Sequence, residues 1–288
     1  MPGAIPPRPA DTEPDAERVQ VALFREASVA RRLHLAFGLS ATVIGAARRA
    51  LARSRPRASI RELDLRFVEL HYGADLAEGL RTDLDRRDSA RRPRGMTESD
   101  LVAALRPLAD AFDALGVRYY LGGSVASSAH GIARASLGAD IIAALEPDHV
   151  DLLTNRLESA YYIPADRLRS AVVSRSSCNL IHLATMLKVD VFVSKDRPFD
   201  RQAAEQARLQ AIDPAPDAPR FPVASPEDTV LAKLEWFRLG GETSERQWWD
   251  IVGVLKVTHD ADLAYLRHWA ASLDVSDLLE RALADAAL

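Results

Sequence analysis

Residues 117–224 alternate between short apolar segments and helix-start signals, and this alternation constrains the fold more than any other feature of the sequence. Short apolar runs bounded by turn residues predict strands, and runs that follow a capping residue predict helices. Because helical patterns flank this block on both sides, we expect an α+β fold: an N-terminal helical segment, a small mixed β-sheet with flanking helices, and a C-terminal helical part. The expected strands span residues 117–121, 139–145, 179–184, 188–193 and 221–224.

Helix-capping patterns locate the expected helices. In the N-terminal segment, Ser59 and Glu62 have the spacing of a capping box, and an apolar stripe follows them. In the C-terminal part, Ser225 begins one helix, and Ser244 with Gln247 has the spacing of a second capping box. After the linker, a helix capped by Thr97 is expected to carry Leu101, Leu105, Leu108 and Phe112. The other helices expected in the middle and C-terminal parts span residues 124–131, 147–160, 225–237, 248–257, 263–273 and 275–287.

Shifts in composition divide the chain. The first residues are rich in proline and charge, which is typical of a disordered tail, and RRDSARRPRG at residues 86–95 is typical of a linker. The helical segment between them has few large apolar residues, so we expect it to pack on the rest of the chain. The expected parts are a tail over 1–17, a helical segment over 18–88, a linker over 89–96, an α/β core over 97–224 and a C-terminal helical subdomain over 225–288.

Composition narrows the class of protein. Of the 288 residues, 48% are hydrophobic and 27% are charged, as in an ordinary soluble protein. Cys178 is the one cysteine, which excludes a disulfide within the chain and a zinc site made of cysteines. We therefore expect a reducing compartment, the cytoplasm. The N-terminus lacks the apolar core of a secretory signal, and charged residues interrupt the apolar runs, so we expect no membrane span.

Charge is unevenly distributed along the chain. Residues 18–95 hold 17 arginines and nine acidic residues, for a charge of +8, whereas residues 96–288 carry −9. Two interpretations remain open. Either these residues form solvated helix faces, or the basic part docks on the acidic part or on nucleic acid.

A Gly-Gly-Ser turn joins the first expected strand to a helix. Gly122 and Gly123 allow a ligand to approach the backbone closely. Ser124 adds a hydroxyl at the helix N-terminus, where backbone N–H groups favour a phosphate. The alternative is a tight turn in which Ser124 only caps the helix.

Two aspartates interrupt apolar strands. Asp140 follows Ala139, and Asp190 lies between valines in the strand 188–193. Aspartate is rare in strands and costly to bury unpaired, so each carboxylate indicates a function. Two such carboxylates at one end of a sheet suit Mg²⁺, with nucleotide phosphates completing its ligand shell. The alternative is that each faces water on the polar side of its strand.

The C-terminal part holds three further candidates for nucleotide binding. Lysine is scarce in this chain, and Lys233 lies inside an apolar helix, where its ammonium can neutralise a triphosphate or simply extend to the surface. Asp228 precedes it by five residues and also fits the third helical position after a cap at Ser225. Arg238 near the following Gly-Gly turn can contact phosphates of a nucleotide or RNA.

Taken in order, these pieces resemble the nucleotidyltransferase superfamily with the minimal DNA polymerase β-like fold, and within it the AbiEii/MenT-like toxin branch. The resemblance covers about residues 100–285. Residues 20–88 also look like a small helical protein that accompanies such enzymes, the antitoxin. The matching motifs are Gly123-Ser124, Asp140, Lys188-Val189-Asp190, Asp228-x4-Lys233-Leu234 and a late Asp250.

The resemblance implies an activity and a set of roles. It implies transfer of a nucleoside monophosphate from a nucleoside triphosphate to an RNA, the tRNA 3′ end in MenT-like relatives. Asp140 and Asp190 would hold Mg²⁺, Asp190 would also activate the attacking hydroxyl, and Lys233 would neutralise the triphosphate. Residues 18–88 would contact the enzyme part within the same chain and limit its activity. The nucleotide-binding set would comprise Gly122, Gly123, Ser124, Lys188, Asp228, Arg238 and Asp250.

The sequence departs from the family at Gly138, where the first of two metal-binding carboxylates is expected. Three alternatives are open. Asp140 and Asp190 are enough to bind the metal, a shift in register supplies another acidic residue, or the site is catalytically inactive. In the last case the chain is a catalytically degenerate protein that binds nucleotide or RNA without transfer. A third possibility is a nucleotidyltransferase for small cationic molecules such as aminoglycosides, because the acidic enzyme part suits a cation better than RNA.

Overall fold

The structure is a computed structural model that describes residue 5 and residues 12–87 and 99–287. The described chain is a mixture of helices and strands, which confirms the predicted α+β class. It divides into two compact units, each built from several stretches of sequence. The first unit comprises Met1–Ala36, Tyr120–Arg134 and Asp196–Leu288, and the second comprises Phe37–Tyr119 and Ala135–Lys195.

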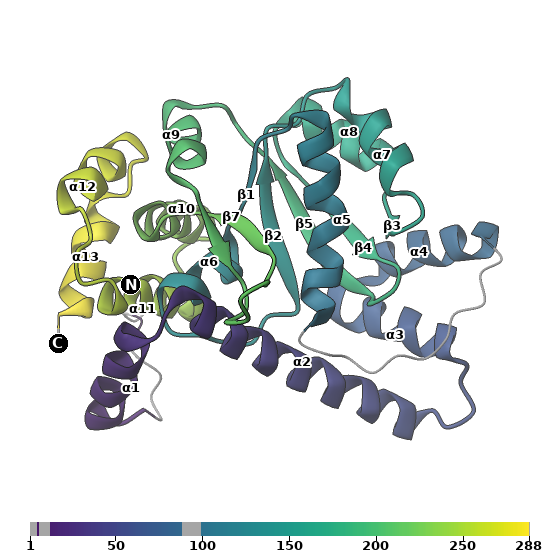
Figure 1. Cartoon of the computed structure of the whole chain (residues 1–288), viewed down its shortest axis with the longest axis horizontal. Coiled ribbons are helices and arrows are strands. Elements are labelled where there is room, and N and C mark those ends of the chain that lie inside the picture. The colour runs from purple at the N-terminus through teal and green to yellow at the C-terminus, as the bar shows by residue number, and fades with distance from the viewer. Residues whose placement is uncertain (1–4, 6–11, 88–98, 288) are drawn as a thin grey trace. The chain divides into compact units, whose positions relative to one another are not determined.

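Figure 1 labels the helices and most of the strands. The described helices are α1 (Pro14–Glu26), α2 (Val29–Ser54), α3 (Ile60–Tyr72), α4 (Ala74–Arg87), α5 (Ser99–Leu115), α6 (Gly123–His130), α7 (His149–Leu157), α8 (Ala165–Ser174), α9 (Pro198–Gln206), α10 (Pro226–Leu239), α11 (Glu245–Val257), α12 (Leu263–Ser272) and α13 (Ser276–Ala286). The described strands are β1 (Tyr119–Leu121), β2 (Gly138–Ala143), β3 (Tyr161–Tyr162), β4 (Ser177–His182), β5 (Leu187–Val193), β6 (Arg208–Ala211) and β7 (Arg220–Val223).

The first unit combines a short sheet with the C-terminal helices. Its strands lie in the order β1-β7-β6, with β1 parallel and β6 antiparallel to β7. Trp248 is fully buried and packs against the tilted ring of Phe237, within an apolar core formed by α9 to α13. The N-terminal helix α1 packs on α11 in this unit, where Glu17 and Lys256 form a buried ion pair 2.5 Å long.

The second unit carries the longer strands. They lie in the order β3-β4-β5-β2, with β2 parallel to β5 and β4 antiparallel to it. Alternate residues of β2 and β5 are buried, which is the period expected when one face of a sheet is covered. The strands expected over residues 179–184 and 188–193 are β4 and β5, and they pair as an antiparallel hairpin.

Serine caps form where they were predicted, but the capping box predicted for Ser244 and Gln247 forms only in part, because the side-chain oxygen of Gln247 has no hydrogen-bond partner. Ser59 and Glu62 form the complete capping box at the start of α3. The hydroxyls of Ser225 and Ser244 accept the backbone N–H groups of the third residue of α10 and of α11. Gly73 ends α3 with a φ of 101°, a backbone conformation that glycine adopts most easily.

Four elements were not predicted: β3, α8, α9 and β6. The strand β6 is too exposed to show an alternating apolar pattern, and β3 has two residues. The predicted linker over 89–96, the proposed cap Thr97 and most of the predicted tail lie outside the described residues. The predicted domain boundaries stay a prediction, although residues 1–36 belong to the same compact unit as the C-terminal helices.

Helix α2 bears on the prediction that no segment spans a membrane. By length and composition it is apolar enough to cross one, a property shared with core helices and signal sequences. The prediction therefore remains untested.

Candidate functional site

The predicted site residues fall in both units, and each group is described within its own unit. Asp140, Lys188 and Asp190 belong to the second unit. The first unit holds the others: Gly122, Gly123, Ser124, Asp228, Lys233, Arg238 and Asp250.

Asp140 and Asp190 are register partners on the parallel strands β2 and β5. Paired residues on neighbouring strands point to the same face of a sheet, with backbones about 4.8 Å apart. Both aspartates lie on the partly exposed face, whereas Ala139, Val189 and Val191 on the opposite face are buried. The fold thus places the two predicted carboxylates side by side.

Asp190 is held from two directions. The ammonium of Lys188 lies 2.7 Å from one carboxylate oxygen, and the side-chain amide of Asn179 on β4 donates to the other. Asn179 is the register partner of Asp190 across the antiparallel pair. These contacts fix the carboxylate and balance its charge, so a ligand that binds Asp190 must replace or share them.

The two carboxylates fit the chemistry of the Mg²⁺ ion that the resemblance implies. Mg²⁺ is commonly held by one or two carboxylates, with water and substrate phosphates as its other ligands. Among the described residues, no group of three or more histidine, cysteine or acidic side chains gathers to hold a metal by itself. Asp140 and Asp190 are therefore the side chains that would hold the ion, and it would need the nucleotide to complete its ligands.

Gly138 lies at the start of β2, opposite Lys188 on β5. A Cβ atom at this position would come within 2.5 Å of the Lys188 carbonyl oxygen, closer than real Cβ atoms approach. A carboxylate at position 138 would therefore require the strand backbone to move. The packing of these two strands thus agrees with a glycine at position 138, where the resemblance implies a carboxylate.

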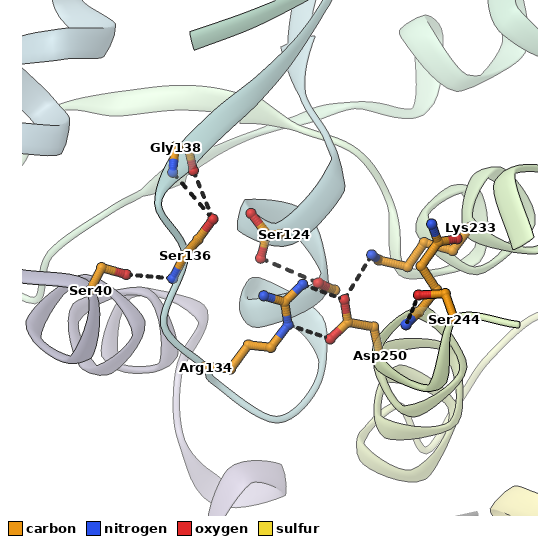
Figure 2. A network of polar contacts seen from close by, with 10 residues as sticks. Ser40, Ser124, Arg134, Ser136, Gly138, Lys233, Ser244 and Asp250 are labelled. Atoms are coloured by element: carbon orange, nitrogen blue, oxygen red, sulfur yellow. Dashed lines mark hydrogen bonds and ion pairs between the residues drawn. The ribbon is translucent and has the colours of Figure 1, made fainter. Parts of the chain in front are cut away.

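N-terminal helices contact the segment that leads into β2. The backbone N–H of Ser136 donates to the Ser40 hydroxyl of α2 at 2.9 Å, as drawn in Figure 2. The Tyr72 hydroxyl of α3 donates to the Leu137 carbonyl at 2.8 Å, and the Tyr72 ring lies 5.8 Å from the Lys188 ammonium. Burial raises the pKa of Tyr72, so the phenol stays protonated.

The Gly-Gly-Ser turn forms the junction between β1 and α6. Gly123 has a φ of 50°, in the left-handed region that glycine tolerates, and it starts α6. Ser124 is buried in the first turn. The predicted strand–turn–helix context is present, and the phosphate-binding role of the turn stays a prediction.

Lys233 and Asp250 meet in the first unit. Arg134 binds both oxygens of Asp250 with two bonds of 2.6 Å, and the Lys233 ammonium lies 2.8 Å from one of them (Figure 2). Burial alone would raise the pKa of Asp250, but the hydrogen bonds and charges of Arg134 and Lys233 outweigh it and hold that pKa below its ordinary value. Lys233 is therefore a buried partner of Asp250, and a triphosphate would have to compete with this carboxylate.

Asp228 and Arg238 have protein partners in the first unit. The carboxylate of Asp228 is 2% exposed and accepts hydrogen bonds from Ser225 at 2.6 Å and from Tyr265 at 2.7 Å. Desolvation raises the pKa of Asp228 despite these bonds. Arg238 at the end of α10 pairs with Glu242 and Asp277 at the surface. Their nucleotide-binding roles stay predictions.

Sequence reasoning did not single out three residues that organise these sites. Asn179 and Tyr72 reach Asp190 and the start of β2 through strand pairing and helix packing, which leave no local signal in the sequence. Arg134 forms a two-bond ion pair with Asp250. Its position shortly before β2 gave no hint of a partner 116 residues away.

Comparisons with known proteins do not assign this chain to a family. No family model matches the chain, and no curated protein matches it. Among solved structures, the chain is similar to the crystal structure of an antigenic nucleotidyltransferase-like protein from Paracoccidioides brasiliensis, with 17% identity and a TM-score of 0.39. The similarity covers 65% of this chain and 94% of that one. A likeness this weak establishes neither a family nor an activity.

Proposed function

We propose that this chain is a nucleotidyltransferase that moves a nucleoside monophosphate from a nucleoside triphosphate to the 3′ end of an RNA, with tRNA as the expected acceptor. The proposal is carried by one observation: Asp140 and Asp190 are same-face register partners on adjacent parallel strands. Paired carboxylates on such strands suit a reaction whose catalysis consists of positioning and charge stabilisation.

The protein groups have defined tasks in this reaction. The acceptor hydroxyl attacks the α-phosphorus, the bond to pyrophosphate breaks, and the hydroxyl proton goes to the Asp190 carboxylate. Lys188, 2.7 Å away, stabilises the negative charge of Asp190 beforehand, and Asn179 orients it. Mg²⁺, held by Asp140 and Asp190, would supply charge neutralisation for the phosphates.

The N-terminal helices restrain this enzyme part. Ser40 and Tyr72 hold the segment just before β2, and the Tyr72 ring lies against the side chain of Lys188. Asp140 and Asp190 therefore work next to residues that the N-terminal helices control. This supports the expected toxin-type protein joined to its own inhibitory segment.

The test is transfer of label from each of four α-³²P nucleoside triphosphates to total tRNA by the full chain with Mg²⁺. We expect label on RNA that disappears in Asp190→Asn. The control is Asp151→Asn, because Asp151 is an exposed residue of α7 that pairs with Arg169. Equal labelling by wild type and Asp190→Asn would contradict the proposal.

A second candidate is binding of nucleotide without transfer, and the packing at Gly138 favours it. The 2.5 Å approach to the Lys188 carbonyl leaves no room for the family's first carboxylate. In this case a labelled triphosphate binds the chain, and neither the wild type nor any variant transfers the labelled monophosphate to tRNA.

A further inference from the structure

A pocket of about 410 Å³ lies within the second unit, between α8, the start of β4 and one residue of α4. Its size falls in the range of small-ligand sites. Its lining includes Leu76, Arg167, Ser170, Ser177, Cys178 and Asn179.

The lining of the pocket holds one cation, Arg167, one carboxylate, Asp166, and an uncharged thiol, Cys178. Cys178 is 3% exposed, and burial raises the pKa of its thiol to about 12, so it stays uncharged. Arg167 lies 3.8 Å from Asp75, and both side chains are mostly exposed, so this ion pair is weak in water. The carboxylate of Asp166, also in the lining, binds Arg169 at 2.9 Å. Arg167 is thus the pocket cation that an anionic ligand would meet.

The pocket connects to the candidate site through Asn179. Asn179 is one of the lining residues, and its side-chain amide donates to Asp190. A ligand seated against Asn179 is therefore one side chain away from the carboxylate that would accept the proton.

We propose that this pocket holds a nucleotide of the RNA acceptor strand, with Arg167 on its phosphodiester; the identity of the ligand rests on the proposed function. One arginine beside serine hydroxyls matches the single charge of a phosphodiester. A triphosphate carries several negative charges, whereas the lining offers one cation, Arg167, beside the carboxylate of Asp166.

The test is binding of a fluorescein-labelled, short single-stranded RNA to the full chain over a range of salt concentrations. Arg167→Gln should weaken binding by about 3- to 10-fold and should reduce the slope of log affinity against log salt by about 0.7, the effect of one lost phosphate contact. Arg156→Gln is the control, since Arg156 is an exposed residue of α7 that does not line the pocket. Equal effects of the two variants, or no effect of Arg167→Gln, would overturn the proposal.

Two further experiments distinguish an RNA site from a simple anion site, and the failure of this proposal from the failure of the proposed function. If inorganic phosphate displaces the RNA as well as unlabelled RNA does, the acceptor site is refuted. In the transfer assay, Arg167→Gln should raise the KM for RNA and leave kcat and the KM for the triphosphate unchanged. An unchanged KM for RNA refutes the pocket alone. RNA binding that depends on Arg167, in a wild-type chain that transfers nothing, supports the pocket and refutes the transferase.

Discussion

Asp140 on β2 and Asp190 on β5 occupy paired register positions and share one face of the sheet, 50 residues apart in the sequence. A parallel pair places such residues side by side without a turn between them. Asp190 is further held by Lys188 and Asn179. Two carboxylates, a lysine and an amide therefore meet on neighbouring strands within one unit.

The first prediction concerns Gly138. Gly138→Ala should destabilise the fold by about 1–3 kcal/mol, because its Cβ meets a backbone carbonyl that moves only with its strand. Gly138→Asp should cost at least as much and should not raise transfer. Urea denaturation and the labelling assay measure the two effects. As a control, Gly45→Ala in α2 should be neutral or stabilising, since its Cβ meets only the flexible Arg49 guanidinium. A stable Gly138→Asp variant with higher transfer activity would contradict this prediction and would show that position 138 can accommodate a carboxylate that acts in the reaction.

The second prediction concerns Asp250. Asp250→Asn leaves the cations of Arg134 and Lys233 without their shared carboxylate, and should cost about 3–5 kcal/mol in the free energy of unfolding at pH 7. The pKa of Asp250 is lowered in the folded state, so this stability is present above its unfolded pKa of about 3.9 and is lost as pH falls through the lowered value. The difference between wild type and variant should therefore shrink in acid. Asp277→Asn, at the exposed pair with Arg238, should cost less than about 1 kcal/mol. If Asp250→Asn and Asp277→Asn lowered the free energy of unfolding equally, burial of the Asp250 ion pairs would not contribute to stability as proposed.

The third prediction concerns His130, whose Nε2 is assigned as donating to the Ala224 carbonyl at 2.7 Å. Desolvation lowers the pKa of His130 to about 4. Between that value and the unfolded pKa of about 6.5, the unfolded chain binds more protons, so stability falls as pH falls through this window. Wild type should lose about 2 kcal/mol between pH 7.5 and pH 5 from this group alone.

His130→Gln removes the titrating group and should lose correspondingly less stability over the same interval, measured by urea denaturation at both pH values. The control His268→Gln changes an exposed residue of α12 and should keep the wild-type dependence. If the stability of His130→Gln depended on pH as strongly as that of the wild type, a group other than His130 would be responsible for the pH dependence.

The fourth prediction concerns Tyr72. Tyr72→Phe keeps the ring beside Lys188 and removes the hydrogen bond to the Leu137 carbonyl. If this contact restrains the start of β2, its loss should raise the rate of transfer by about 2- to 10-fold, the range set by one hydrogen bond. Tyr72→Ala should raise the rate further. Initial rates with labelled triphosphate and tRNA measure both, and rates at or below wild type would contradict the inhibitory role.

Substitution is a sharper test of inhibition than deletion of the N-terminal helices. Val21 and Leu33 are fully buried, and Glu17 forms its buried ion pair with Lys256. Removing residues 1–95 would expose this surface of the first unit, so a loss of activity in the shortened chain would not distinguish unfolding from inhibition.

Local patterns were enough to predict the elements that carry the candidate site. The alternation around Asp190 identified β5, the two glycines before Ser124 located the start of α6, and the serine caps gave the starts of α10 and α11. The helices α8 and α9 were missed because their apolar positions are few, and each has only two or three buried residues.

The partners of the site residues could not be predicted. Asn179 reaches Asp190 only through the register of β4 on β5, and Lys233 meets Asp250 only through the packing of α10 on α11. Such contacts depend on how strands and helices pair in three dimensions, and the spacing of residues in a single sequence does not predict that pairing. The apolar surroundings of Lys233 were visible, whereas its pairing with a carboxylate was not.

The most direct measurement is a double-mutant cycle of the transfer rate with Asp140→Asn, Asp190→Asn and the double variant in the full chain. If the two carboxylates act as one unit, each single variant should lose about 100-fold or more, and the double variant should be little slower than either. Folding of each variant is checked by its urea transition. Losses that multiply in the double variant, or a single variant that keeps the wild-type rate, would contradict a shared role for Asp140 and Asp190.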